Sequence, residues 1–125
     1  MARTVSEVLP DLAHFTGTTA YVRHRLGGRT LLLTDGAKYV AEEAGAYWLM
    51  DIVALSGHEW LREGNGFCVV ELRVTGYEGR LRVEDGNGGL IHDQPIEFTD
   101  FPEPGLAFFL QPYMGEPVLM LKSEY

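Results

Sequence analysis

Glycine divides this chain into short apolar segments, and this feature constrains the fold more than any other. The 125 residues include 15 glycines, most of which fall between apolar runs. Glycine adopts turn conformations at no steric cost, so this spacing is typical of short strands joined by tight turns. The sequence contains no internal repeat, low-complexity stretch or long linker, and we expect one domain over residues 1–125.

Alternating apolar and polar residues mark the clearest strands. The segments 67–75 and 80–84 place apolar side chains at every second position, as half-buried antiparallel strands do. Gly27-Gly28 predicts a two-residue hairpin, and we expect Pro95 to lie in an edge or bent strand because proline lacks an N–H. Five further apolar runs bring the predicted strands to about seven: 20–26, 29–34, 90–98, 106–110 and 118–122.

Charge selects the turn between the two alternating segments. A loop at Tyr77-Glu78 would set Arg73 opposite Arg82, whereas a loop at Glu78-Gly79 sets Arg73 opposite Glu84. Opposite charges across a strand pair contribute roughly 0.2–1 kcal/mol, and like charges destabilise it. We therefore predict the second register.

A long helix follows the first hairpin. Residues 38–55 contain no proline, Asp35 can cap the start and Ser56-Gly57 can end the helix. A short N-terminal helix within residues 5–15 is less favoured because Pro10 interrupts it. The sequence thus predicts an α+β fold, with an antiparallel sheet of about six to seven strands packed against one long helix, plus a possible short N-terminal helix.

One stripe of the long helix is expected to face the sheet. With about 100° per residue, this stripe consists of Ala37, Ala41, Ala44, Trp48, Ile52 and Leu55. We predict that Trp48 is buried between helix and sheet, where its replacement by alanine would cost about 3–5 kcal/mol.

The opposite side of the helix is also apolar, which is unusual for a helix that covers a sheet. The N-terminal segment could cover this side, or another protein chain could do so, and both alternatives stay open. In the second case the side is a protein-contact face for a second copy or for a target. Its candidate residues are Tyr39, Ala46, Met50 and Val53, bordered by Glu42 and Glu43.

No set of residues indicates catalysis, a metal ion or a cofactor. Asp51 is expected to accept hydrogen bonds from neighbouring groups, and the single cysteine, Cys68, is expected to be a small buried thiol. None of the histidines has a partner at zinc-ligand spacing; they are His14, His24, His58 and His92. We therefore assign no catalytic, cofactor-binding or metal-ligating residue.

The charge and the hydropathy pattern bear on partners and location. Ten Lys and Arg against 18 Asp and Glu give a net charge of −8. This balance argues against direct nucleic-acid binding, which needs clustered positive charge. The N-terminal residues lack the apolar stretch of a secretory signal, and no segment reads as a membrane span. We expect a cytoplasmic protein without membrane contact.

Four segments resemble a family of small uncharacterised bacterial proteins, a domain of unknown function often encoded on plasmids and phages. They are the stretch 35–52, the turn Asp85-Gly86-Asn87-Gly88, the run Thr99-Asp100-Phe101-Pro102 and the ending Leu121-Lys122-Ser123-Glu124-Tyr125. The resemblance spans roughly residues 14–125. It implies a single domain and a mobile-element origin, and it brings no catalytic residue, substrate or cofactor.

These observations favour a non-enzymatic acidic binding protein that acts through protein–protein contact. An inhibitor of a host defence protein or of a nucleic-acid-binding protein would fit this description. One alternative is a small ligand-binding domain or enzyme with a pocket between helix and sheet. A second alternative is a structural homodimer without further activity.

A double substitution separates the two coverings of the second helix side. If another chain covers it, Met50→Glu with Val53→Lys abolishes the complex and leaves the monomer folded. If this side is internal core, the same variant loses its fold. Size-exclusion chromatography and circular dichroism distinguish the two outcomes.

Overall fold

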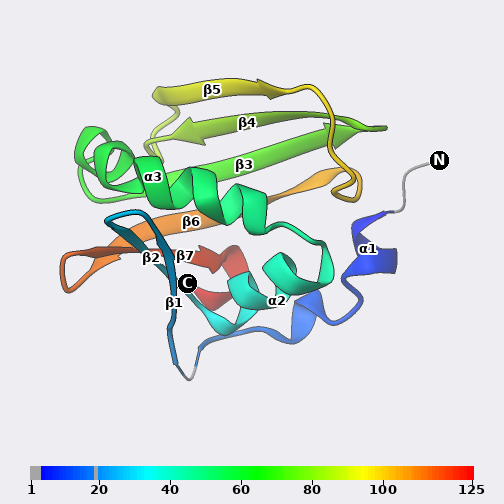
Figure 1. Ribbon diagram of the computed structural model, residues 1–125, viewed down its shortest axis with the longest axis horizontal. Helices are drawn as coiled ribbons and strands as arrows, with labels where there is room; N and C mark the ends of the chain where they lie inside the picture. The colour runs from blue at the N-terminus through cyan, green and yellow to red at the C-terminus, as the bar shows by residue number, and fades with distance from the viewer. Residues whose placement is uncertain (1–3, 19) are drawn as a thin grey trace.

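The computed structural model describes residues 4–18 and 20–125 and shows a seven-stranded sheet with helices across one face (Figure 1). The α+β prediction is confirmed. In chain order the elements are α1 (Val5–Val8), the 3-10 helix η1 (Leu12–His14), β1 (Val22–Leu26), β2 (Arg29–Leu33), α2 (Asp35–Glu43), α3 (Tyr47–Glu63), β3 (Cys68–Thr75), β4 (Glu78–Glu84), β5 (Leu90–Ile96), β6 (Gly105–Tyr113), β7 (Glu116–Leu121) and the 3-10 helix η2 (Lys122–Glu124).

The sheet is mixed rather than wholly antiparallel. Its strand order is β1-β2-β7-β6-β3-β4-β5, and β2 runs parallel to β7 while all the other neighbours are antiparallel. The chain leaves β2 for the helices and returns to this sheet position only at its C-terminal end. The hairpin at Gly27-Gly28 and the edge position of the Pro95 strand, β5, are confirmed.

The predicted long helix is divided into two helices. α2 ends at Glu43 and α3 begins at Tyr47. Between them, Gly45 has a φ of +60°, a conformation that glycine adopts readily and that disfavours a continuing helix. α3 then runs to Glu63, past the predicted end at Ser56-Gly57.

The break changes which side of the helical segment faces the sheet. Ala37 and Ala41 of α2 are fully buried, as the predicted stripe requires. Beyond the break the same stripe turns outward, so that Leu55 is 50% exposed and Trp48 is only half-buried. The buried tryptophan is Trp60, at 4% exposure. The prediction that Trp48 lies between helix and sheet is therefore wrong.

The β3–β4 turn lies at Gly76-Tyr77, which differs from both registers considered from charge. Gly76 has a φ of +62° and supplies the backbone conformation of the turn. Arg73 consequently lies opposite Arg80. Each arginine has its own carboxylate: Nε of Arg73 is 2.8 Å from Glu71 Oε1, and Arg80 donates to both oxygens of Asp93 at 2.7 and 3.1 Å. These ion pairs offset the like-charge contact.

One carboxylate joins the C-terminal turn η2 to the start of α2. Oε1 of Glu124 accepts hydrogen bonds from the Thr34 hydroxyl at 2.6 Å and from the Leu121 N–H at 3.0 Å. Its Oε2 accepts the Gly36 N–H at 2.9 Å. Thr34 is the N-cap and also accepts the Ala37 N–H. Thr34 and Glu124 therefore satisfy the helix start, and Asp35 lies in the first turn instead of capping it.

Removal of this carboxylate should destabilise the whole fold. Glu124→Ala leaves buried donors without a charged acceptor, and we expect the free energy of unfolding to fall by about 1.5–3 kcal/mol. Gly36→Ala should cost about 1–3 kcal/mol, because the added Cβ would lie 2.5 Å from Glu124 Oε1 and from Leu121 Cδ1. Urea denaturation measures both changes.

Gly28→Ala is the matched control, because no atom lies within 4 Å of the position that its Cβ would take. The midpoint of Gly28→Ala should stay close to that of the original protein. Equal midpoints for Gly36→Ala and Gly28→Ala would contradict the structural role of this contact.

Candidate functional site

Most of the predicted protein-contact face lies inside the molecule. Ala46, Met50 and Val53 have no exposed surface. The break at Gly45 turns their side of α3 toward the sheet, so they belong to the core and the prediction of a contact face there is wrong. The Met50→Glu and Val53→Lys variant is accordingly expected to lose its fold.

The remaining residues of that face lie on α2 and are partly covered by the N-terminal segment. The Tyr39 hydroxyl accepts the Asp11 N–H at 3.2 Å, and its ring centroid is 5.0 Å from that of Phe15. Glu42 and Glu43 stay exposed. The N-terminal segment therefore provides the covering at Tyr39, which is one of the two alternatives that the sequence left open.

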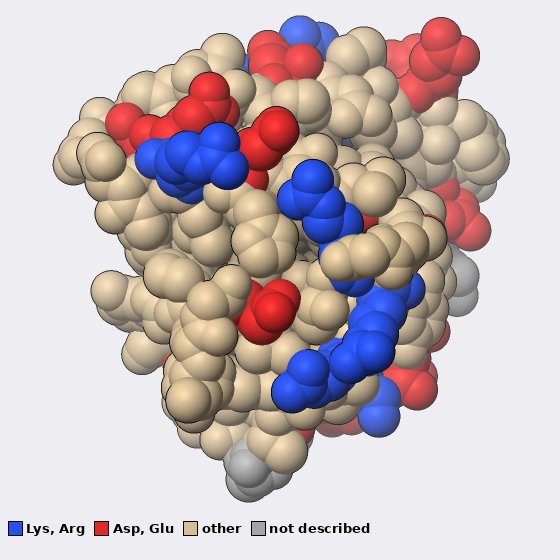
Figure 2. Space-filling view, turned by 60° about the vertical axis from the view of Figure 1, so that its left-hand side comes forward, with Lys and Arg blue, Asp and Glu red and all other residues tan. Residues whose placement is uncertain are grey.

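Three arginines without an ion-pair partner among the described residues lie at the β1–β2 hairpin. Arg23 and Arg25 of β1 and Arg29 of β2 are exposed, and in the part of the chain that the structure describes none of them has an acidic partner within ion-pair distance. Figure 2 shows Lys and Arg side chains gathered in a stripe on this side of the molecule. We call the three arginines the basic edge.

The net charge of the chain gives no indication of the basic edge. The basic edge holds three of the ten Lys and Arg residues within the positions 23–29 of a chain whose charge is −8. Local counting of charge along the predicted hairpin would have identified it. Only the structure shows that no acidic side chain within residues 4–18 and 20–125 neutralises it.

β1 also has a free strand edge. It is the first strand of the sheet, and among the described residues it pairs with β2 alone. In an antiparallel pair, alternate residues direct their N–H and C=O groups away from the neighbouring strand. An edge of this kind is a ready template for another strand. Free backbone groups and unpaired arginines therefore occur on the same element.

His24 attaches the middle of β1 to α3. Its Nε2 lies 2.7 Å from Asp51 Oδ1, and its side chain is 17% exposed. The ring centroid is 5.8 Å from that of Tyr47. Alternation along the strand directs Arg23 and Arg25 to the other side. His24 therefore supplies the hydrogen bond that the sequence predicts for Asp51, and the contact attaches the edge strand to α3.

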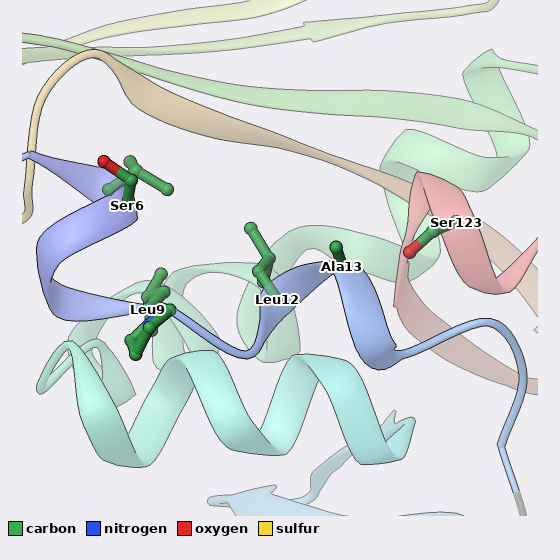
Figure 3. Close-up of a pocket in the computed structure, with 7 residues that line it drawn as sticks. Ser6, Leu9, Leu12, Ala13 and Ser123 are labelled. Atoms are coloured by element: carbon green, nitrogen blue, oxygen red, sulfur yellow. The ribbon is translucent and has the colours of Figure 1, made fainter.

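A hollow lies between the N-terminal segment and the C-terminal turn (Figure 3). It has a volume of about 400 Å³ and is lined by Val5, Ser6, Leu9, Pro10, Leu12, Ala13 and Ser123. An adjoining hollow of about 220 Å³ shares Leu12 and Ser123 and adds Leu106, Ala107, Leu121 and Lys122. We call the two together the N-terminal groove. It differs in place from the helix–sheet pocket considered from the sequence.

The segments that carry the family resemblance build turns and contacts. The Asp85 carboxylate accepts the N–H groups of Asn87 and Gly89 at 2.8 and 2.9 Å, and these bonds hold the pKa of Asp85 below its usual range. The Thr99 hydroxyl accepts the N–H of Phe101, which is fully buried. The ending 121–125 contributes the carboxylate that joins η2 to α2. These roles are structural.

Metal binding and membrane spanning find no support among residues 4–18 and 20–125. No three His, Cys, Asp or Glu side chains there are grouped so that they could hold a metal ion. Within the same residues, no helix combines the length and the apolar character that crossing a membrane requires.

Comparison with known proteins identifies a family and gives no activity. A family model described as a family of unknown function (DUF6876) matches residues 6–125. No curated protein and no solved structure is significantly similar to the chain.

Cys68 should be inert in the folded protein. The side chain has no exposed surface, and its thiol donates to the Trp60 carbonyl oxygen at 3.1 Å. Burial, and then the nearby charges of Asp85 and Glu63, raise its pKa to about 11. Since the thiolate is the nucleophile, we expect no alkylation by iodoacetamide at pH 8 until urea unfolds the chain. Mass spectrometry measures the modification, and rapid alkylation of the folded protein would contradict this assignment.

Proposed function

The chain belongs to DUF6876, a family of unknown function, and we propose that it is a non-enzymatic binding domain that takes an acidic, extended segment of a partner protein along β1. One observation carries this proposal. The basic edge has three exposed arginines without acidic partners in the described part of the chain, on and next to a strand whose outer edge is free.

The two features support the same mode of binding. An extended segment adds to a free sheet edge through main-chain hydrogen bonds, and its alternate side chains supply specificity. Arg23 and Arg25 are two positions apart on β1 and therefore project from the same face. A partner with carboxylates at every second position matches this spacing. The guanidinium fork binds carboxylates in a bidentate way, which favours arginine over lysine for this contact.

A nucleic acid fits the surface less well than an acidic peptide. Nucleic-acid affinity grows with the number of phosphates that lysines and arginines neutralise. The basic edge offers three arginines in a chain with a net charge of −8, so the rest of the molecule repels a polyanion. A protein segment presents only a few carboxylates and also fills the free strand edge.

Self-association through β1 is disfavoured by the same charges. Two copies paired edge to edge would bring six arginines together, and like charges across an interface suppress association. The partner is therefore a different protein. The mobile-element origin that the resemblance implies, with a host defence protein or another host protein of the cytoplasm as target, is consistent with such a role and forms part of the proposal.

A pair of short peptides tests the proposed binding mode. The first is a fluorescein-labelled peptide of three Glu-Val repeats, and its control replaces every Glu by Lys. We expect the Glu peptide to raise fluorescence anisotropy on binding, with affinity falling as salt increases because screening weakens surface charge contacts. Arg23→Glu with Arg25→Glu should weaken this binding at least tenfold.

Arg62→Glu is the matched control, because Arg62 is exposed on α3 and is not one of the three arginines of the basic edge. It should leave the affinity unchanged. A Glu peptide N-methylated at alternate residues tests the strand pairing and should lose binding. Equal binding of the Lys peptide, or tighter binding of an oligothymidylate of similar length, would overturn the proposal.

A further inference from the structure

We propose that the N-terminal groove binds an aliphatic carboxylate, with the hydrocarbon chain along the groove and the carboxylate at Lys122. This site is separate from the basic edge, and it does not depend on the proposed peptide binding.

The lining of the groove has a composition unlike the rest of the molecule. The chain contains 18 Asp and Glu residues, yet none of them lines either part of the groove. The walls consist mainly of aliphatic side chains and alanines, and among the residues that the structure describes Lys122 is the one ionisable residue in the lining. A surface of this kind complements a ligand that is apolar along its length and negatively charged at one end.

The smaller part of the groove lies where the sheet is incomplete. β6 pairs with β3 from Gly105 onward, but its pairing with β7 begins only at Phe108. β7 ends at Leu121, where η2 turns away from the sheet. Leu106 and Ala107 are therefore left without a strand neighbour on that side, and they form part of the lining.

The side chains converge on this space from both ends of the chain. Figure 3 shows Leu12 and Ala13 on η1 and Ser6 on α1 directed toward the space below β6, with Ser123 entering from the C-terminal side. The larger part, at about 400 Å³, lies within the range of small-molecule sites, roughly 300–1,000 Å³. The groove therefore accommodates a flexible chain rather than a folded partner.

Lys122 is available to a carboxylate. Its ammonium lies 5.6 Å from the centre of the ring of Phe109, a residue outside the lining, so the side chain must rotate toward the groove to meet a bound carboxylate. No acidic side chain in the described residues is within ion-pair distance to hold it where it is. The Ser123 hydroxyl donates to the Phe15 carbonyl oxygen at 2.6 Å, so it is already engaged. Burial of methylene groups contributes more than a surface ion pair. The length of the ligand's hydrocarbon chain should thus determine the affinity, and Lys122 should make the site prefer a negatively charged head group.

Titration with decanoate below its micelle concentration tests the site, with amide shifts followed by NMR. We expect saturable shifts at residues 5–13, 106–107 and 121–123. Butanoate has too short a chain and should bind at least tenfold more weakly. Decyltrimethylammonium has the same chain with the opposite charge and should also bind at least tenfold more weakly.

Two pairs of variants test the placement. Ala13→Trp fills the groove from an exposed position and should reduce decanoate affinity at least tenfold, whereas Ala20→Trp adds the same bulk outside the lining and should not. Lys122→Glu should reduce the affinity at least tenfold, and Lys122→Arg should preserve it. Circular dichroism verifies that each variant is folded.

Three results would overturn the proposal. They are equal affinity for decanoate and decyltrimethylammonium, unchanged affinity in Ala13→Trp, and loss of decanoate binding in the Arg23→Glu and Arg25→Glu variant. The last result would place the carboxylate at the basic edge. Because that variant leaves the groove intact, failure of the peptide experiment and failure of this one are distinguishable.

Discussion

The carboxylate of Glu124 joins parts of the chain that are far apart in sequence, and it fixes the C-terminal turn against the start of α2. It accepts hydrogen bonds from Thr34, Gly36 and Leu121, so it satisfies the start of α2 and closes the turn after β7 together. This turn takes the chain away from β6 and leaves the sheet incomplete there. The smaller part of the N-terminal groove lies where β7 ends, because a longer β7 would occupy the space beside Ala107.

A single glycine decides which side of the helical segment becomes core. A helical wheel for one uninterrupted helix predicts the buried side correctly up to Ala41, which is fully buried. After Gly45 the phase changes, so that Met50 is buried and Leu55 is half exposed. The apolar residues on both sides of the helical segment are thus explained without a second protein chain covering one side. They reflect two helices that each bury a different side against the same sheet.

The local charge at β1, rather than the net charge of the chain, indicates a binding surface. The chain is strongly acidic as a whole, yet the hairpin retains three arginines without acidic partners in the described residues. Elsewhere the arginines of the sheet face carboxylates, as Arg80 does at Asp93. The contact between His24 and Asp51 holds β1 against α3, which keeps the edge strand ordered while its outer side stays free. A preformed edge reduces the entropy lost when a partner strand binds.

The sequence by itself determined those features that depend on neighbouring residues. Two-residue periodicity identified the strands, Gly27-Gly28 identified the first hairpin, and Pro95 indicated an edge strand, because steric and hydrogen-bonding limits act within a few residues. Only the tertiary structure decided the helix phase after Gly45, the parallel pairing of β2 with β7 and the turn at Gly76. The tertiary structure also determined where the two candidate sites, the basic edge and the N-terminal groove, are located. The basic edge and the groove each depend on which distant residues lie nearby, and no local pattern encodes contacts such as that between Thr34 and Glu124.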